Sequence, residues 1–375
     1  MNISKLVAPY GKSIMPILAH AMVNMKQGVG TLTVTDIETR LTIKLRQSEK
    51  IDRAFMVPIK ELSEKFKGVK NIRVTDTGLA DVSGSIHCSL NETIAPEDFP
   101  LKRTMKEPVE VQIKDTQVFF DILKQTLLFY PKHKIVSEYA NCLFITYGEG
   151  DTEIVATDVF NLIRFRTDSV VLPDNAPFKF SRQRISKHHL GGFLLPAAAI
   201  KRLLQIYDRK KPLECVVYNQ EYAVFDDGTA EFTVRLPKPE MPVYDTALER
   251  AGCYGDEYLV IDPGVILKDL SKFLAEHRKD NVVTVLYDHT DTITLRPVIT
   301  QEEDSVSWNY PAARITGIPG MGRIALNGVD LERALKVPGT DRIRWESGEL
   351  TPIALKGTCA GYKFDIIIMP VRFWV

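Results

Sequence analysis

The sequence lacks the features that mark a membrane-spanning or secreted protein. No run of apolar residues approaches the ~18 that a transmembrane helix needs, and the opening MNISKLVAPYGKS has no apolar core of the signal-peptide kind. The five cysteines include no close pair. This spacing provides no Cys-x-x-Cys motif and predicts reduced thiols in a cytoplasm.

Signatures of catalysis are also missing. There is no glycine-rich phosphate loop followed by Lys-Ser/Thr, and no His-Glu-x-x-His. Asp36 and Asp158 could act as paired carboxylates, but each follows a threonine in a repeated turn. Capping of that turn by the aspartate side chain is the better explanation. We therefore expect no enzyme activity, no catalytic residue, no metal and no cofactor.

Neither sign of charge is in excess, because 48 basic and 48 acidic side chains give a formal net charge of zero. Only a local asymmetry could therefore indicate a nucleic-acid partner. A hydrophobic content of 45% and a charged content of 26% describe a soluble globular protein. A length of 375 residues indicates two or three domains.

What the sequence does contain is internal repetition. The segment TVTDIETRLTIKL at 33–45 is echoed by VATDVFNLIRFR at 155–166, and both place Thr-Asp before an alternating strand. An apolar strand turning into a helix occurs at 55–68, 193–208 and 324–337. A strand followed by a longer amphipathic helix occurs at 109–127 and 258–277. Repeats at such long intervals indicate recurring structural units.

The starts of three of these helices have their own signals. Pro58 and Pro196 stand where two helices should begin, a position that needs no backbone donor, and Asn327 is a suitable N-cap for the third. The order of events predicts an α+β protein of three repeated units, with boundaries near 97–108 and 236–252. Three unrelated α+β domains with chance similarity are the alternative.

Several of these motifs, taken in order, resemble a known family. APEDFP (95–100), the Ala-Thr-Asp turn at 156–158, MPVYDTAL (241–248) and IIIMPVRF (366–373) are similar to motifs of the bacterial sliding clamp, the β subunit of DNA polymerase III. The resemblance implies three clamp domains at 1–105, 106–247 and 248–375. It also implies a head-to-tail homodimeric ring, with helices lining a central hole and antiparallel sheets outside.

The resemblance implies a basic, DNA-facing surface on the helices. Ordinary solvated helix faces are the alternative for any single lysine, since acidic neighbours dilute the pattern. The helix candidates are Lys60, Lys65, Lys67, Lys124, Lys201, Arg202, Lys268, Lys272, Arg333 and Lys336. Further candidates resembling DNA contacts of the family are Lys12 and a loop with Lys132, His133, Lys134 and Tyr139.

The family binds short peptides of partner proteins in a groove between its second and third domains. Carried over to this chain, the groove comprises Ala140, Thr157, Val159, Phe160, Asn161, Leu162, Pro242, Thr246, Ala247, Pro352, Ile367, Met369, Pro370, Val371, Arg372 and Phe373. This chain has Val-Phe-Asn-Leu after Thr-Asp where the family usually has Gly-His-Arg-Leu. We expect a narrower and more apolar pocket, unless Phe160 is a plain core aromatic.

Other features concern the ring itself. Val111 and Ile113 match one side of the family's dimer seam and Phe273 and Leu274 the other, although all four could equally be core residues. Domain 1 begins with about two helical turns instead of a strand and a full helix. Domain 2 carries a longer basic loop at 171–192, and Trp374 and Val375 extend past the family's usual end.

The function that the resemblance implies is a cytoplasmic processivity factor. It would encircle double-stranded DNA without reading its sequence. It would also tether DNA polymerase, the clamp loader and other proteins that carry a clamp-binding motif. The alternative is a clamp-fold interaction module that binds partner peptides without encircling DNA.

Overall fold

The computed structural model covers the chain and describes most of it. The described residues are 2–26, 29–45, 52–69, 71–91, 93–100, 102, 105–131, 138–148, 151–173, 189–218, 221–238, 244–255, 258–277, 281–287, 292–298, 307–314, 322–344 and 351–371. They form two compact units, one of Met1–Gln117 with Ala198–Pro237 and one of Val118–Ala197 with Lys238–Val375. This division passes through the expected second domain, so the three domain boundaries stay a prediction.

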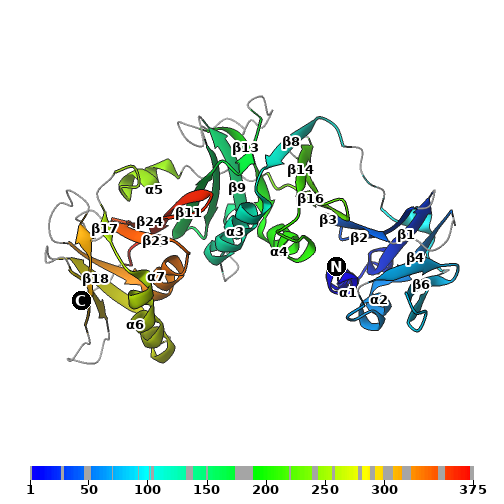
Figure 1. Cartoon of the computed structure of the whole chain (residues 1–375), viewed down its shortest axis with the longest axis horizontal. Helices are drawn as coiled ribbons and strands as arrows, with labels where there is room; N and C mark the ends of the chain where they lie inside the picture. Colours follow the sequence, from blue (N-terminus) through cyan, green and yellow to red (C-terminus); the bar gives the residue numbers. More distant parts are fainter. Residues whose placement is uncertain are drawn as a thin grey trace. The chain divides into compact units, whose positions relative to one another are not determined.

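The first unit is built on one long antiparallel sheet (Figure 1). Its strands follow the order β8 (Pro108–Ile113), β14 (Glu214–Tyr218), β15 (Tyr222–Asp226), β16 (Ala230–Arg235), β3 (Thr39–Leu45), β2 (Val29–Thr35), β1 (His20–Lys26) and β4 (Arg53–Pro58). A small sheet adds β5 (Ile72–Thr75), β6 (Gly78–Asp81) and β7 (His87–Ser89). Its α-helices are α1 (Ile3–Val7), α2 (Ile59–Lys65) and α4 (Ala197–Ile206), with short 3-10 turns at Ala8–Lys12, Pro16–Ala19 and Pro96–Asp98.

The second unit has a similar long antiparallel sheet and a smaller one. The long sheet runs β13 (His189–Pro196), β9 (Cys142–Gly148), β10 (Thr152–Thr157), β11 (Asn161–Thr167), β25 (Tyr362–Ile368), β24 (Ile353–Cys359), β23 (Thr340–Arg344), β17 (Leu259–Val260) and β21 (Ala313–Arg314). The smaller sheet runs β20 (Trp308–Pro311), β19 (Thr292–Pro297), β18 (Val282–Tyr287) and β22 (Gly322–Asn327). Further elements are β12 (Val170–Val171), α3 (Thr116–Thr126), α5 (Asp245–Arg250), α6 (Pro263–Glu276), α7 (Gly328–Leu335) and 3-10 turns at Leu127–Phe129 and Glu138–Asn141.

The predicted starts of the helices are confirmed. α2 begins directly after Pro58, and α4 begins directly after Pro196. Asn327 caps α7, since its side-chain oxygen accepts hydrogen bonds from the backbone N–H groups of Val329 and Asp330. The strand-then-helix segments also appear, as β8 followed by α3 and β17 followed by α6. The α+β class and its repeated units are therefore present in the fold.

Within each unit, buried apolar side chains hold the helices against the sheets. In α2, Ile59 and Leu62 are buried, and in α6 the buried residues are Ile266, Leu270 and Phe273 at helical spacing. All five cysteines are free thiols. No helix in the described ranges is long and apolar enough to cross a membrane.

Candidate partner-peptide site

A tight turn between β10 and β11 forms one wall of the candidate site. The Thr157 hydroxyl donates to the carbonyl of Asn161 over 2.7 Å, and the Val159 N–H donates to that hydroxyl over 3.0 Å. The Asp158 carboxylate accepts from the Asn161 N–H at 2.7 Å. This confirms the predicted capping role of Asp158. Val159 takes a φ of 83°, which turns its side chain out of the strand pattern.

The C-terminal segment forms the facing wall. β25 pairs antiparallel with β11, with Leu162 opposite Ile367. Beyond the strand, the Met369 N–H donates to the carbonyl of Phe160 over 3.2 Å, and the Val371 N–H donates to the carbonyl of Ala325 over 3.0 Å. The predicted final strand is confirmed, and the segment after it runs from the turn to β22.

Three apolar side chains are exposed around this junction, and we call them the apolar patch. Phe160 is 65% exposed, Val159 is 43% exposed and Met369 is 41% exposed. Exposed large apolar residues that lie together mark surfaces for association. Phe160 is therefore not a core aromatic, which removes the alternative that the sequence left open. A mobile thioether such as Met369 also suits contact with varied partners.

An ion pair connects this turn to helix α7. Arg333 on α7 donates to the Asp158 carboxylate over 3.0 Å and also pairs with Asp330 over 3.1 Å. Both Asp158 and Arg333 are largely buried, so removing either residue would leave the charge of the other less well compensated. Sequence reasoning placed Arg333 among the DNA-facing candidates and missed this contact. The two residues are 175 positions apart, and no local pattern connects them.

A buried charge network links the paired strands β11 and β25. Arg164, 3% exposed, donates to Asp365, fully buried, over 2.7 Å, and to Glu153 over 3.2 Å. Burial disfavours the charged guanidinium, but the Asp365 and Glu153 carboxylates outweigh it and raise the pKa of Arg164. The hydroxyl of Tyr244 donates to Glu153 over 3.0 Å, and burial raises the pKa of that phenol. No local sequence pattern predicts this network, because Arg164 and Asp365 are 201 positions apart.

The remaining predicted pocket residues fall into three groups. Ala140, Thr157, Asn161, Leu162, Pro352 and Ile367 are buried, so their side chains are not open to a peptide in the free chain. Thr246 is exposed on α5, while Ala247, Pro370 and Val371 are half-buried. Ala247 packs against the buried cluster that includes Leu162, Leu248 and Ile367. Pro242, Arg372 and Phe373, as well as Trp374 and Val375, lie outside the described residues.

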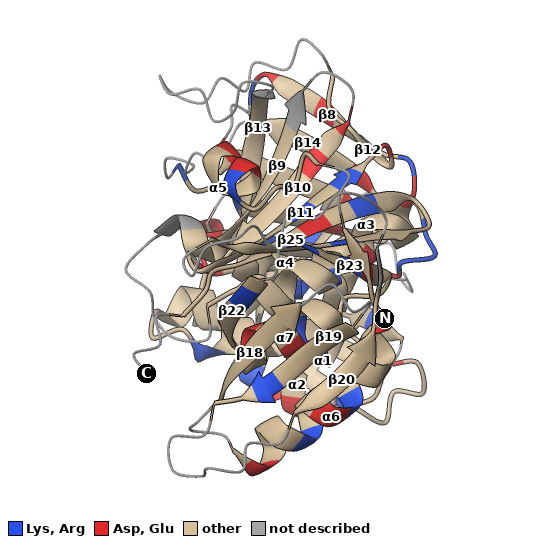
Figure 2. Cartoon of the chain, turned by 90° about the vertical axis from the view of Figure 1, so that its left-hand side faces the viewer, with Lys and Arg blue, Asp and Glu red and all other residues tan. Residues whose placement is uncertain are grey.

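Most basic residues predicted to face DNA are exposed, and acidic groups accompany some of them. Lys12, Lys60, Lys124, Lys201, Lys268, Lys272 and Lys336 are exposed. Lys336 pairs with Glu332 at 2.8 Å, and basic and acidic residues lie close together on α6 (Figure 2). Lys132, His133 and Lys134 lie outside the described residues, as does the side chain of Tyr139 and most of the basic loop 171–192.

Arg202 has an internal role that sequence reasoning did not anticipate. Its guanidinium lies 4.7 Å from the ring centre of Tyr10 and donates to the carbonyl of Leu6 over 3.3 Å. These contacts tie α4 to the N-terminal helical segment of the same unit. Arg202 therefore has less freedom to reach a phosphate than the exposed lysines have.

The four predicted seam residues divide evenly. Val111 and Phe273 are buried within the chain, and Phe273 stacks on His277 with ring centres 4.8 Å apart. Ile113 and Leu274 are half-buried. Of these four residues, only Ile113 and Leu274 offer accessible surface to a second chain. Val111 and Phe273 are core residues of the single chain.

No family sequence model and no curated protein sequence matches the chain. Its fold is nevertheless that of the bacterial sliding clamps. DNA polymerase III subunit beta from Pseudomonas aeruginosa aligns with 99% of this chain and 96% of its own, with a TM-score of 0.77 and 18% identity. The beta subunit from Thermotoga maritima aligns with 99% of this chain and 97% of its own, with a TM-score of 0.75 and 18% identity. Pol III beta from Caulobacter crescentus aligns with 99% of this chain and 98% of its own, with a TM-score of 0.76 and 15% identity.

Proposed function

We propose that the chain is a DNA sliding clamp. Two copies would join head to tail into a ring that encircles duplex DNA in the cytoplasm and tethers the replicative polymerase and other partners. The observation that carries the proposal is the fold match over 99% of this chain and 96% of the Pseudomonas clamp. The similarity thus extends over nearly the full length of both chains.

The task requires no chemistry. A ring holds DNA by topology, so its contacts with phosphates need only be weak, exchangeable and salt-sensitive. Exposed lysines on several helices, such as Lys60, Lys124, Lys201 and Lys268, suit such contacts. Ring closure would also cover strand edges that a single chain leaves open.

The apolar patch is the proposed docking site for partner peptides. Val159, Phe160 and Met369 would receive apolar side chains of an extended peptide, while the turn and the C-terminal segment fix their positions. Phe160 stands where related clamps usually have a histidine. We therefore propose that this site favours more aromatic and aliphatic anchors than the usual clamp-binding motif has.

Sedimentation velocity at micromolar concentration tests the ring. The proposal predicts a stable dimer. A chain that stays monomeric across this range would contradict the ring and favour a clamp-fold module that binds peptides without encircling DNA.

A further inference from the structure

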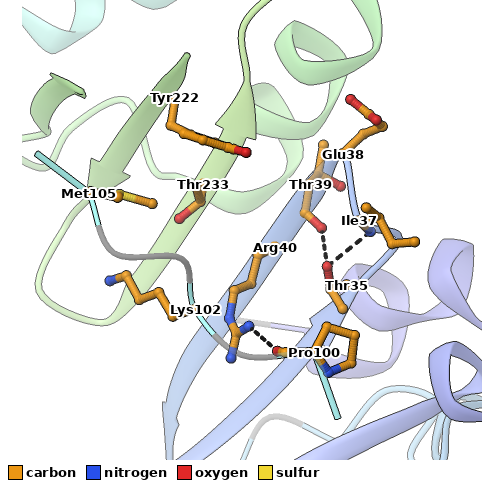
Figure 3. A pocket seen from close by; sticks show the side chains of 10 residues that line it. All are labelled: Thr35, Ile37, Glu38, Thr39, Arg40, Pro100, Lys102, Met105, Tyr222 and Thr233. Carbon is orange, nitrogen blue, oxygen red and sulfur yellow. Dashed lines mark hydrogen bonds between the residues drawn. The ribbon is translucent and has the colours of Figure 1, made fainter. Parts of the chain in front are cut away.

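The first unit contains a cavity that no part of the proposed function uses. Its volume is about 230 Å³, and Ile37, Arg40, Pro100, Lys102, Met105 and Tyr222 are among its lining residues (Figure 3). The side chains come from the end of β2, the turn that follows it, β3, β15 and β16, and from residues 100, 102 and 105. Most of the exposed surface of the lining is apolar, and its charged residues are Glu38, Arg40 and Lys102.

The turn between β2 and β3, which lies beside this cavity, has the same hydrogen-bond pattern as the turn at the apolar patch. The Thr35 hydroxyl donates to the carbonyl of Thr39 over 2.8 Å, and the Ile37 N–H donates to that hydroxyl over 3.1 Å. The Asp36 carboxylate accepts from the Thr39 N–H at 2.6 Å. Ile37 has a φ of 78°, close to the 83° of Val159. Ile37 is also exposed, as Val159 is.

The strand pairing beside the turn is repeated as well. β3 pairs with β16 as β11 pairs with β25. The Arg235 N–H donates to the carbonyl of Glu38 over 2.8 Å, matching the bond from Met369 to Phe160. The same backbone scaffold therefore occurs once in each unit, and in the first unit a cavity lies against it.

The side chains on the two scaffolds differ in charge. Glu38 takes the place of Phe160, and Arg40 takes the place of Leu162. The Arg40 guanidinium lies 5.6 Å from the ring centre of Phe99 and donates to the carbonyl of Pro100 over 2.7 Å. Among the described residues, no carboxylate lies within ion-pair distance of it. Burial lowers the pKa of Arg40, and the charge of Glu231 offsets this only in part, so a bound anion would relieve the remaining unfavourable desolvation.

The other two charged lining residues, Lys102 and Glu38, are paired with residues outside the lining. Lys102 donates to Glu231 over 2.7 Å, and Arg235 donates to Glu38 over 3.1 Å. Arg40 differs from these two cations, because within the described part of the chain no carboxylate lies at ion-pair distance from it and Glu231 acts on it only from further away. A carboxylate of a bound molecule would give Arg40 an ion-pair partner.

We propose that this cavity is a second docking site, for an extended peptide of a partner protein that carries an aspartate or glutamate beside an apolar side chain. The carboxylate would accept from Arg40, and the apolar side chain would pack against Ile37 and Met105. A nucleic-acid phosphate is disfavoured, because the side chains of Ile37, Pro100 and Met105 in the lining are apolar and offer a phosphate no hydrogen-bond donor. The site does not depend on the chain encircling DNA.

Methyl NMR of the full chain can test the site directly. The protein is labelled with ¹³C at the methyl groups of its nine methionines, and Met105→Leu assigns the signal of interest. The probes are acetyl-Leu-Asp-Leu-amide and its Asn analogue. The aspartate peptide should shift the Met105 signal in a saturable way. The Asn analogue should bind about tenfold more weakly, since it loses a charged hydrogen bond.

Two variants separate this site from the apolar patch. Arg40→Gln should abolish the preference for aspartate over asparagine, whereas Phe160→Ala should leave the Met105 response unchanged. The proposal is overturned if both peptides bind equally to the wild type, or if only the Met369 signal moves. It is also overturned if inorganic phosphate shifts Met105 at the same concentration as the aspartate peptide does. None of these readouts depends on DNA binding, so they leave the clamp proposal to its own tests.

Discussion

Arg333 on α7 and Asp158 in the turn before β11 form an ion pair of 3.0 Å. The pair links a helix of the C-terminal part of the chain to the turn that presents Val159 and Phe160. Asp158 also accepts from the N–H groups of Phe160 and Asn161. The backbone position of the exposed Phe160 is therefore fixed by the largely buried Asp158, whose charge pairs with Arg333.

Arg333→Ala should destabilise the fold by about 2 kcal/mol, the scale of one charged hydrogen bond. The loss stays moderate because Asp158 keeps its backbone donors. Urea unfolding gives the measurement, and Lys336→Ala is the matched control, since Lys336 forms an exposed pair with Glu332 on the same helix. Equal stability of the two variants would contradict the supporting role of Arg333.

Phe160→Ala should weaken partner-peptide binding without unfolding the chain. The side chain is 65% exposed, so the free energy of unfolding should change by no more than about 0.5 kcal/mol. Peptides selected from a phage-displayed random library on the wild type serve as probes, and their affinity should fall roughly 30-fold. Phe165→Ala is the contrasting variant, because that ring is fully buried and its loss should cost about 3–5 kcal/mol of stability. Unchanged peptide affinity would remove Phe160 from the site.

Tyr10 should make the first unit sensitive to alkaline pH. Burial raises the pKa of this phenol to about 12, above its value near 10 in an unfolded chain. The native state therefore holds the proton more tightly. The resulting stability is fully present below pH 10 and is lost as the pH rises through 12.

Tyr10→Phe should reduce this alkaline loss by up to about 2–3 kcal/mol. Urea unfolding between pH 8 and 12 measures the difference. Tyr218→Phe, at a half-exposed position of β14, controls for the general effect of removing a phenol. A pH profile of Tyr10→Phe that parallels the wild type would refute the assignment.

The exposed lysines of α6 should contribute to DNA binding through charge alone. Replacing both Lys268 and Lys272 with alanine should lower the slope of log affinity against log salt by about 2, or one per phosphate contact. Fluorescence anisotropy with a labelled DNA duplex, at several salt concentrations, gives the slope. Lys363→Ala, an exposed lysine on β25, should leave it unchanged. An unaltered slope in the double variant would exclude α6 from the DNA surface.

Local signals in the sequence were sufficient to predict much of the fold. Pro58, Pro196 and Asn327 marked helix starts because their effect on the backbone is local. The Thr-Asp pairs likewise marked the turns at Asp36 and Asp158, where the side chain bonds to backbone only three residues away.

Contacts between distant segments could not be predicted in the same way. Arg164 meets Asp365 across 201 positions, and the charge of either residue alone reads as an exposed surface group. Arg202 looked like a DNA contact because only the folded unit shows that Tyr10 lies beneath it. The order of the short motifs, more than any single one, made the fold recognisable.

Retention on circular DNA tests the proposed function most directly. The chain is assembled on a nicked circular duplex by the clamp loader of its host and then passed through a gel-filtration column at high salt. The account predicts that the chain elutes with the circle and is released once a restriction enzyme linearises it. Loss from the intact circle, or retention that survives linearisation, would contradict a ring that slides on DNA.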